Sequence, residues 1–273
     1  MNARSPIGIF DSGIGGLTVA NAVSRHLPQE EIIYIGDTAH FPYGDKSVEA
    51  IQQYALRLSE VLLQKHCKMI LIACNTASAA AFPLLQQELK DRGVLLVNVI
   101  DPVVDSVCSE PAMKKVGIIA TKGTISSGVY EQKIKAKNPK LEVASLATQL
   151  LAPMIESGFY NNSVSQAIIN SYLTYPDFQD IDGMILACTH YPLVRREIDY
   201  FFKGRIRIFD STDVTARYVA GLLERHHLLR SGETPHHHFY VTDLTESFAQ
   251  TARLFYPGAL TLEYLPVWET EPS

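Results

Sequence analysis

The chain has 273 residues, which is room for one large or two ordinary domains with a substantial hydrophobic core. Hydrophobic residues make up 47% and charged residues 19%, and the net charge is −5 with Lys and Arg scattered along the chain, a composition that argues against a nucleic-acid-binding surface. No apolar run approaches the roughly 18 residues of a membrane span, and the N-terminal sequence MNARSPIGIF lacks the pattern of a secretion signal, so we expect a cytoplasmic protein without a membrane anchor.

The first predicted strand covers residues 7–10 and runs into the loop DSGIGG, residues 11–16, before a helix that starts near Leu17. Glycines in such a loop let several backbone N–H groups point at one place, which suits a carboxylate or phosphate ligand. Asp11 at the head of the loop would repel a pyrophosphate and favours a ligand with both charges, such as an amino acid. The alternative is a glycine-rich turn that only lets strand and helix pack closely.

A second strand, residues 31–35, leads into the long polar loop GDTAHFPYG, residues 36–44. The FPYG sequence has strong turn-forming character and predicts a pocket wall or lid that carries the hydroxyl of Tyr43. An ordinary turn with an exposed Tyr43 is the alternative. A helix is predicted over residues 47–64, where apolar residues recur at helical spacing.

The stretch MILIACNTAS combines a buried parallel strand, residues 69–73, with a cysteine and the start of a helix. Asn75 and Thr76 are N-cap residue types, so we expect Cys74 at the carboxyl end of the strand, where ligands of open α/β sheets bind. The N–H groups of the helix N-terminus should lower the pKa of this thiol. Taken alone, a cysteine at the end of a strand is more often a small buried core residue. We expect Pro83 to break or kink the helix.

The second half of the chain repeats this order of strands and loops. A strand at residues 116–120 followed by TKGTISSG resembles the first strand and its glycine loop, and MILACTH, residues 184–190, resembles MILIACNT. Further strands are predicted at residues 94–100, 141–146 and 205–210. We therefore expect two similar α/β units in tandem, each with a cysteine at the same structural position, Cys74 and Cys188.

A pair of equivalent cysteines favours a shared chemical role over packing. In a pseudo-twofold arrangement, the sulfur atoms of Cys74 and Cys188 would face each other across a cleft between the units. Neither has CxxC spacing, and even with His190 as a third ligand the pair offers few soft ligands, so we predict no metal site. We expect all four cysteines to be free thiols, with Cys67 and Cys108 in structural roles.

The segments FDSGIGG, FPYG, ACNTA, TKGTI and ACTHYPL occur in this order, and with them the chain resembles glutamate racemase of the aspartate/glutamate racemase family over essentially its whole length. The resemblance implies an α/β fold of two pseudo-symmetric three-layer domains with mainly parallel sheets and an active site in the cleft between them. It also implies that the C-terminal segment returns to the first domain, which fits short β-like runs at residues 239–242 and 260–264. The expected domains are residues 1–100 plus 212–273, and residues 101–211.

The resemblance assigns Cys74 and Cys188 as the groups that move protons at Cα, the former for the D isomer and the latter for the L isomer, without a cofactor. Racemisation removes a proton from one face of the carbon and returns one to the other, so two bases on opposite faces can do it without turning the substrate over. Asp11 is expected to hold the substrate ammonium or to assist Cys74, and His190 to assist Cys188. The positions assigned to substrate contact or to support of the thiols are Asp11, Ser12, Tyr43, Gly44, Asn75, Thr76, Thr189 and His190, with Thr121 and Glu156 as less specific matches.

The residues alone are also consistent with other functions. A racemase for aspartate or another acidic amino acid would use the same thiols, because the thiols set the reaction and not the side-chain length. A thiol-dependent redox or hydrolytic enzyme would form covalent intermediates instead, and an amino-acid-binding regulator is a third alternative. The resemblance implies L- and D-glutamate as substrates and a supply of D-glutamate for peptidoglycan, and it leaves open a homodimer and activation by a cell-wall precursor.

Overall fold

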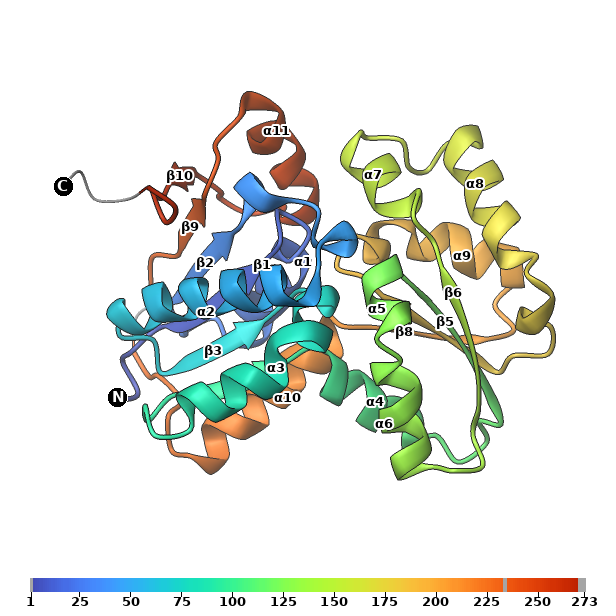
Figure 1. Cartoon of the computed structure of the whole chain (residues 1–273), viewed down its shortest axis with the longest axis horizontal. Helices are drawn as coiled ribbons and strands as arrows, with labels where there is room; N and C mark the ends of the chain where they lie inside the picture. The colour runs from blue at the N-terminus through green and yellow to red at the C-terminus, as the bar shows by residue number, and fades with distance from the viewer. Residues whose placement is uncertain (1, 233–234, 270–273) are drawn as a thin grey trace.

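The computed structural model describes residues 2–232 and 235–269 and contains two β-sheets, one in each half of the view in Figure 1. The strands of the first sheet, in the order β10-β9-β2-β1-β3-β4, are β1 (Ile7–Asp11), β2 (Ile32–Gly36), β3 (Met69–Ile72), β4 (Leu95–Asn98), β9 (His238–Val241) and β10 (Leu262–Tyr264). Those of the second, in the order β6-β5-β7-β8, are β5 (Lys115–Ala120), β6 (Glu142–Ala147), β7 (Gly183–Ala187) and β8 (Arg207–Asp210). Neighbouring strands in both sheets run parallel.

The two sheets share one strand order, since β2-β1-β3-β4 in the first corresponds to β6-β5-β7-β8 in the second. This correspondence follows the sequence repeat and confirms the predicted α/β class with mainly parallel sheets. β9 and β10 extend only the first sheet, where β9 pairs with β2 from Ile33 opposite His238 to Gly36 opposite Val241. The C-terminal segment therefore joins the sheet that the start of the chain forms.

Helices cover both faces of the first sheet. α1 (Leu17–His26), α10 (Asp213–Arg225) and α11 (Glu246–Phe255) pack on one face, and α2 (Val48–Gln64) and α3 (Asn75–Leu89) pack on the other. The side chains of β3 alternate between these layers, so that Met69 and Leu71 share a core with α1, and Ile70 and Ile72 share one with α2 and α3. Burial on both faces explains why the strand sequence is apolar throughout.

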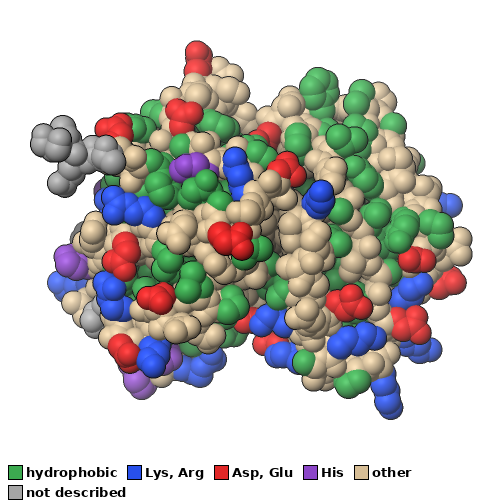
Figure 2. Space-filling view, in the orientation of Figure 1, with side chains coloured by type: hydrophobic (Ala, Val, Ile, Leu, Met, Phe, Trp, Pro, Cys, Tyr) green, Lys and Arg blue, Asp and Glu red, His purple; other side chains and the backbone are tan. Residues whose placement is uncertain are grey.

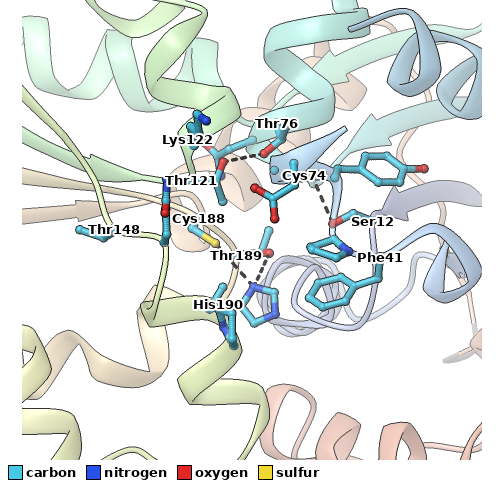
Figure 3. Close-up of a pocket in the computed structure, with 18 of the residues that line it drawn as sticks. Ser12, Phe41, Cys74, Thr76, Thr121, Lys122, Thr148, Cys188, Thr189 and His190 are labelled. Carbon is cyan, nitrogen blue, oxygen red and sulfur yellow. Dashed lines mark hydrogen bonds between the residues drawn. The ribbon is translucent and has the colours of Figure 1, made fainter. Parts of the chain in front are cut away.

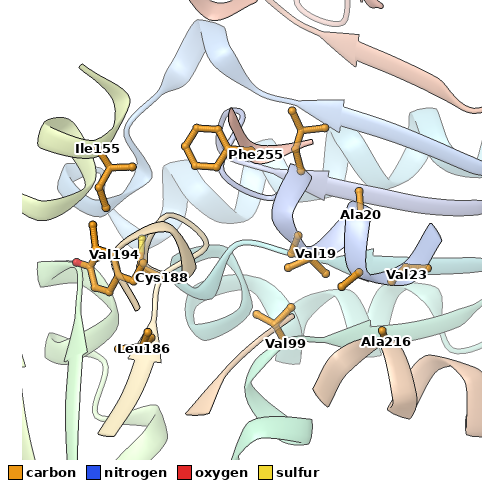
Figure 4. Packing of buried hydrophobic residues seen from close by; sticks show 14 of the residues in the cluster. Val19, Ala20, Val23, Val99, Ile155, Leu186, Cys188, Val194, Ala216 and Phe255 are labelled. Carbon is orange, nitrogen blue, oxygen red and sulfur yellow. The ribbon is translucent and has the colours of Figure 1, made fainter. Parts of the chain in front are cut away.

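The second sheet is also covered on both faces. α4 (Ile100–Cys108) and α6 (Val129–Lys137) lie on one face, and α7 (Leu151–Glu156), α8 (Ser163–Leu173) and α9 (Arg195–Phe202) lie on the other. Short helices occupy the connections: α5 (Lys122–Ser126) and the 3₁₀ turns η1 (Thr38–His40), η2 (Tyr43–Asp45), η3 (Pro176–Phe178) and η4 (Tyr191–Val194). One hydrophobic cluster contains residues of both units, among them Val19 of α1 and Leu186 of β7 (Figure 4).

Most of the predicted elements are present, and the differences are local. The helix predicted at residues 47–64 is confirmed as α2, whose N-cap Ser47 accepts a hydrogen bond from the backbone N–H of Ala50. Of the two outcomes predicted at Pro83, the break is wrong, because α3 continues through it with the buried Ala81 and Leu85 packed on either side, and the kink stays a prediction. Tertiary packing therefore outweighs the hydrogen bond that proline removes.

The surface carries both signs of charge, interspersed over both units on the face that Figure 2 shows. Apolar side chains are exposed on the second unit, among them Leu150, Phe159 and Tyr200. Within the described ranges, no helix combines the length and the apolar character needed to cross a bilayer. The four cysteines are free, as predicted.

Candidate active site

A cavity of about 120 Å³ lies where loops from both units meet, beyond the carboxyl ends of the strands. Cys74 and Cys188 both line it, the former from the first unit and the latter from the second (Figure 3). Of the residues predicted for the site, those that line the cavity are Ser12, Tyr43, Gly44, Cys74, Asn75, Thr76, Thr121, Cys188, Thr189 and His190. Asp11 and Glu156 are not part of this lining, and each lies behind a residue that is.

Cys74 is the N-cap of α3 and is 6% exposed. Its sulfur accepts a hydrogen bond from the backbone N–H of Ala77 at 3.4 Å, and its thiol donates to the hydroxyl of Ser12 at 3.6 Å. The predicted lowering of its pKa is wrong: burial, with the nearby charge of Asp11, raises the pKa of Cys74 to about 12. The loss of hydration around the thiolate raises the pKa by more than the helix N-terminus lowers it. Cys74 is therefore a thiol at neutral pH.

Cys188 follows β7 directly and has a different neighbour. Its sulfur lies 3.5 Å from Nδ1 of His190, and Nε2 of the same ring lies 2.7 Å from a carboxylate oxygen of Glu156. Burial lowers the pKa of His190, but the adjacent Cys188 and Glu156 outweigh burial and raise it to about 10. His190 is then an imidazolium at neutral pH, and a positive charge stands beside one thiol only.

Asp11 lies beneath the cavity, fully buried, with burial raising the pKa of its carboxyl. One of its oxygens accepts hydrogen bonds from the backbone N–H groups of Gly13 at 3.2 Å and Gly16 at 2.9 Å. The expected use of the glycine loop therefore needs correction, because the chain's own carboxylate takes two of the N–H groups proposed for a substrate carboxylate. The second Asp11 oxygen has no hydrogen-bond partner within the described ranges.

Polar groups of both units meet on the wall opposite His190. The hydroxyl oxygens of Thr76 and Thr121 lie 2.9 Å apart across the junction, and that of Thr124 lies 3.2 Å and 3.1 Å from them (Figure 3). Asn75 is held by its side-chain oxygen, which accepts a hydrogen bond from the hydroxyl of Tyr130 at 2.7 Å. Its side-chain NH₂ is buried and has no partner in the part of the chain that the structure describes, although the residue itself lines the cavity. Such an unpaired buried donor is uncommon in a folded protein.

The aromatic hydroxyl expected at the pocket wall points elsewhere. Tyr43 is 1% exposed, and its hydroxyl donates to Oδ2 of Asp37 at 2.6 Å, so only the rest of the residue lines the cavity. Asp37, which is fully buried, is not among the predicted site residues. The signal that could have found it is an acidic residue directly after β2, one position beyond the residue that pairs with Asp11.

Lys122 and Thr148 also line the cavity without having been predicted. Lys122 follows Thr121 in the TKGT segment, and among the described lining residues it is the one Lys or Arg. A lysine next to a predicted contact residue would have been enough to propose it. Within residues 2–232 and 235–269, no group of three or more His, Cys, Asp or Glu side chains is arranged to hold a metal ion.

The chain is similar to known proteins over nearly its whole length. The profile of a family described as Asp/Glu/Hydantoin racemase matches residues 17–219. A glutamate racemase of Geobacter metallireducens is 40% identical over 266 residues, which cover 97% of each chain. The crystal structure of glutamate racemase from Francisella tularensis in complex with D-glutamate matches with a TM-score of 0.91 at 36% identity, covering 97% of this chain and 99% of that one. The Escherichia coli glutamate racemase, in complex with L-glutamate and the activator UDP-MurNAc-ala, matches with a TM-score of 0.74 at 25% identity, covering 91% and 92%.

Proposed function

This chain belongs to the Asp/Glu/hydantoin racemase family and is an amino-acid racemase, and from that premise we propose that it interconverts L- and D-glutamate with two cysteines as the acid and the base. The observation that carries the proposal is that Cys74 and Cys188, from equivalent positions of two repeated units, line one cavity. Two thiols that approach from different units can reach opposite faces of one small molecule.

In the proposed L-to-D direction, the thiolate of Cys188 takes the α-proton, so that an S–H bond forms while the C–H bond breaks and its electron pair passes into the substrate carboxylate. The thiol of Cys74 then gives its proton to the opposite face, which leaves D-glutamate, a Cys74 thiolate and a Cys188 thiol. The reverse direction exchanges the two roles. The burial-raised pKa of Cys74 supports its role as the proton donor in the L-to-D direction.

Different residues assist the two thiols. The imidazolium of His190 favours negative charge at Cys188, and Cys188 together with Glu156 raises the pKa of that ring. We assign Asp11, buried next to Cys74, to proton movement at that thiol, because it lies outside the cavity lining where an ammonium would sit.

The α-proton of an amino acid is far less acidic than a thiol, and each pK unit of difference corresponds to about 1.4 kcal/mol. Fixed donors in a site with little water are the means by which proteins stabilise such carbanion charge. Thr76, Thr121 and Thr189 line the cavity with hydroxyls that can serve as such donors, and the unpaired NH₂ of Asn75 is buried beside them. We propose that they hold the substrate carboxylates.

An acidic substrate agrees with the charge of the lining. Lys122 offers a positive charge for a second carboxylate, which a neutral amino acid would not use. The names of the relatives at 36–40% identity favour glutamate over aspartate, since both relatives described above are glutamate racemases. A cytoplasmic enzyme that supplies D-glutamate for peptidoglycan fits this activity, and the activator UDP-MurNAc-ala of the Escherichia coli relative suggests control by a cell-wall precursor. A homodimer stays a prediction.

We further propose that the cleft separates two domains, residues 1–100 plus 212–273 and residues 101–211. The separate sheets and the return of β9 and β10 to the first sheet support this division. The cavity lining, drawn from both parts, supports a site that opens and closes between them.

The experiment that tests the function is circular dichroism of L- and D-glutamate with the purified protein and no added cofactor. Racemisation from both enantiomers is expected, with losses of about 10²- to 10⁴-fold in C74S and in C188S and none in the control C108S, whose cysteine lies outside the cavity lining. Near-normal rates in both serine variants would refute the two-thiol scheme. Activity on aspartate alone, or a covalent intermediate without racemisation, would favour one of the other enzyme functions.

A further inference from the structure

The loop that forms one wall of the cavity, residues 37–45, is fastened to the C-terminal segment. The hydroxyl of Thr38 donates to the carbonyl of Asp243 at 2.6 Å and accepts from the backbone N–H of Asp243 at 2.8 Å. The backbone N–H of Ala39 donates to the hydroxyl of Thr242 at 3.1 Å. The loop is thus tied to a part of the chain about 200 residues away that does not line the cavity.

The buried carboxylate of Asp37 is the centre of this connection. Its Oδ1 accepts hydrogen bonds from the hydroxyl of Thr242 and from the indole N–H of Trp268, each at 2.8 Å. Its Oδ2 accepts the hydroxyl of Tyr43 at 2.6 Å and lies 3.0 Å from Nδ1 of His40. Trp268 and the pocket-wall residue Tyr43 therefore share one carboxylate.

Trp268, the single tryptophan of the chain, is also packed against the same loop. Its ring meets His40 edge-on with ring centres 4.5 Å apart, and Tyr54 of α2 with ring centres 5.5 Å apart. His40 in turn stacks on Tyr54 at 4.0 Å. The indole is thus fixed by two edge-to-face ring contacts as well as by its N–H, so the direction of its hydrogen bond to Asp37 is set by packing.

We propose that Trp268 is a positioning residue for the substrate site: through Asp37 it fixes Tyr43 and the adjoining Gly44 in the cavity wall. This inference rests on the proposed function, since it concerns the wall that would contact the substrate. The other donors to this carboxylate are Tyr43 and His40 of the loop and Thr242 of the C-terminal segment. Loss of the indole N–H therefore removes one of the two hydrogen bonds through which the C-terminal segment holds the Asp37 carboxylate. Among the described residues, the hydrogen bonds of the two thiols go to Ser12, Ala77 and His190 and not to this network, so its loss should weaken substrate binding more than proton transfer.

The test compares W268F, which keeps an aromatic ring but lacks the N–H, with the unmodified full chain. We expect KM for both glutamate enantiomers to rise about threefold to tenfold, with kcat changed less than twofold. T242V removes the other donor to the same Asp37 oxygen and should raise KM in the same way. Because the two residues act on one atom, the rise in the double variant should be smaller than the product of the single effects.

The control is Y264F, which removes a hydrogen bond between Tyr264 and Glu269 in the same C-terminal segment without contacting Asp37. It should leave KM unchanged. A folded W268F with unchanged KM, an equal rise in Y264F, or independent effects of W268F and T242V would overturn the inference. Failure of the proposed function would be visible separately, as absence of glutamate racemisation by the unmodified protein.

Discussion

Replacing Glu156 by glutamine tests the charge arrangement behind Cys188. The substitution keeps the size of the side chain, which is 14% exposed, but removes the negative charge 2.7 Å from Nε2 of His190. A hydrogen bond to a charged group is worth about 1.5–3 kcal/mol, and one pKa unit corresponds to about 1.4 kcal/mol. We therefore expect the pKa of His190 to fall from its value of about 10 by roughly 1–2 units.

The fall in the pKa of His190 decides in which direction the pH profile of activity moves. His190 carries its proton below its pKa, so the imidazolium of E156Q is lost at lower pH than that of the unmodified protein. The alkaline decline of kcat/KM should move down by about 1–2 pH units. Since two enantiomers have equal free energies in water, kcat/KM must fall by the same factor in both directions, and any asymmetry appears in kcat and KM separately.

The assay is the rate of change of the circular dichroism signal from each enantiomer, measured from neutral pH to above the pKa of His190. E60Q serves as the control, because Glu60 forms an exposed ion pair with Arg92 on the surface. Its profile should coincide with that of the unmodified protein. An alkaline decline of E156Q at the same pH as in E60Q would refute the assigned role of Glu156.

Three further outcomes are expected. The raised pKa of His190 means that its ion pair with Glu156 stabilises the folded state. This stabilisation is fully present below about pH 6.5 and is lost as the pH rises through about 10. The melting temperatures of E156Q and the unmodified protein should therefore converge above that pH. In G15A, the new Cβ would overlap Cε1 of His190, so we expect a cost of about 1–3 kcal/mol in urea unfolding together with a large loss of kcat/KM. In G221A on α10, the new Cβ would meet only the end of the Arg225 side chain, at 3.4 Å, so this variant should stabilise by about 0.5–1 kcal/mol; equal effects of the two would contradict the close approach at Gly15. K122M should raise KM for glutamate about threefold to tenfold with kcat nearly unchanged, and K122R should restore it; an unchanged KM in K122M would remove Lys122 from the site.

The parts of the site that the sequence predicts are those fixed by local structure and by the repeat. Residues 69–73 and 183–187 are apolar because both faces of their strands are buried, and parallel strands in the same order bring Cys74 and Cys188 to equivalent positions. The turn from strand to helix predicted at Cys74 is confirmed, but the N-cap of α3 is Cys74 itself and not Asn75 or Thr76. Local rules are sufficient for these features because they depend on neighbours within a few residues.

The features that the sequence does not predict depend on partners far along the chain. The pKa of Cys74 is decided by burial between two units and not by the helix N-terminus alone. The Gly13 and Gly16 N–H groups are taken by Asp11, which requires the folded shape of the loop. The hydroxyl of Tyr43 turns to Asp37, where the indole of Trp268 also binds.

The central claim, that two thiols act on opposite faces of one carbon atom, is tested most directly by the isotope content of the product. L-Glutamate is incubated with the protein in heavy water, the reaction is stopped while conversion is small, and deuterium at Cα is measured by mass spectrometry in each separated enantiomer. The two-thiol account predicts that the D-glutamate formed carries deuterium delivered by the solvent-exchanged Cys74, while the remaining L-glutamate keeps its proton. D-glutamate that retains the original proton, or equal deuterium in both enantiomers from the earliest times, would contradict it.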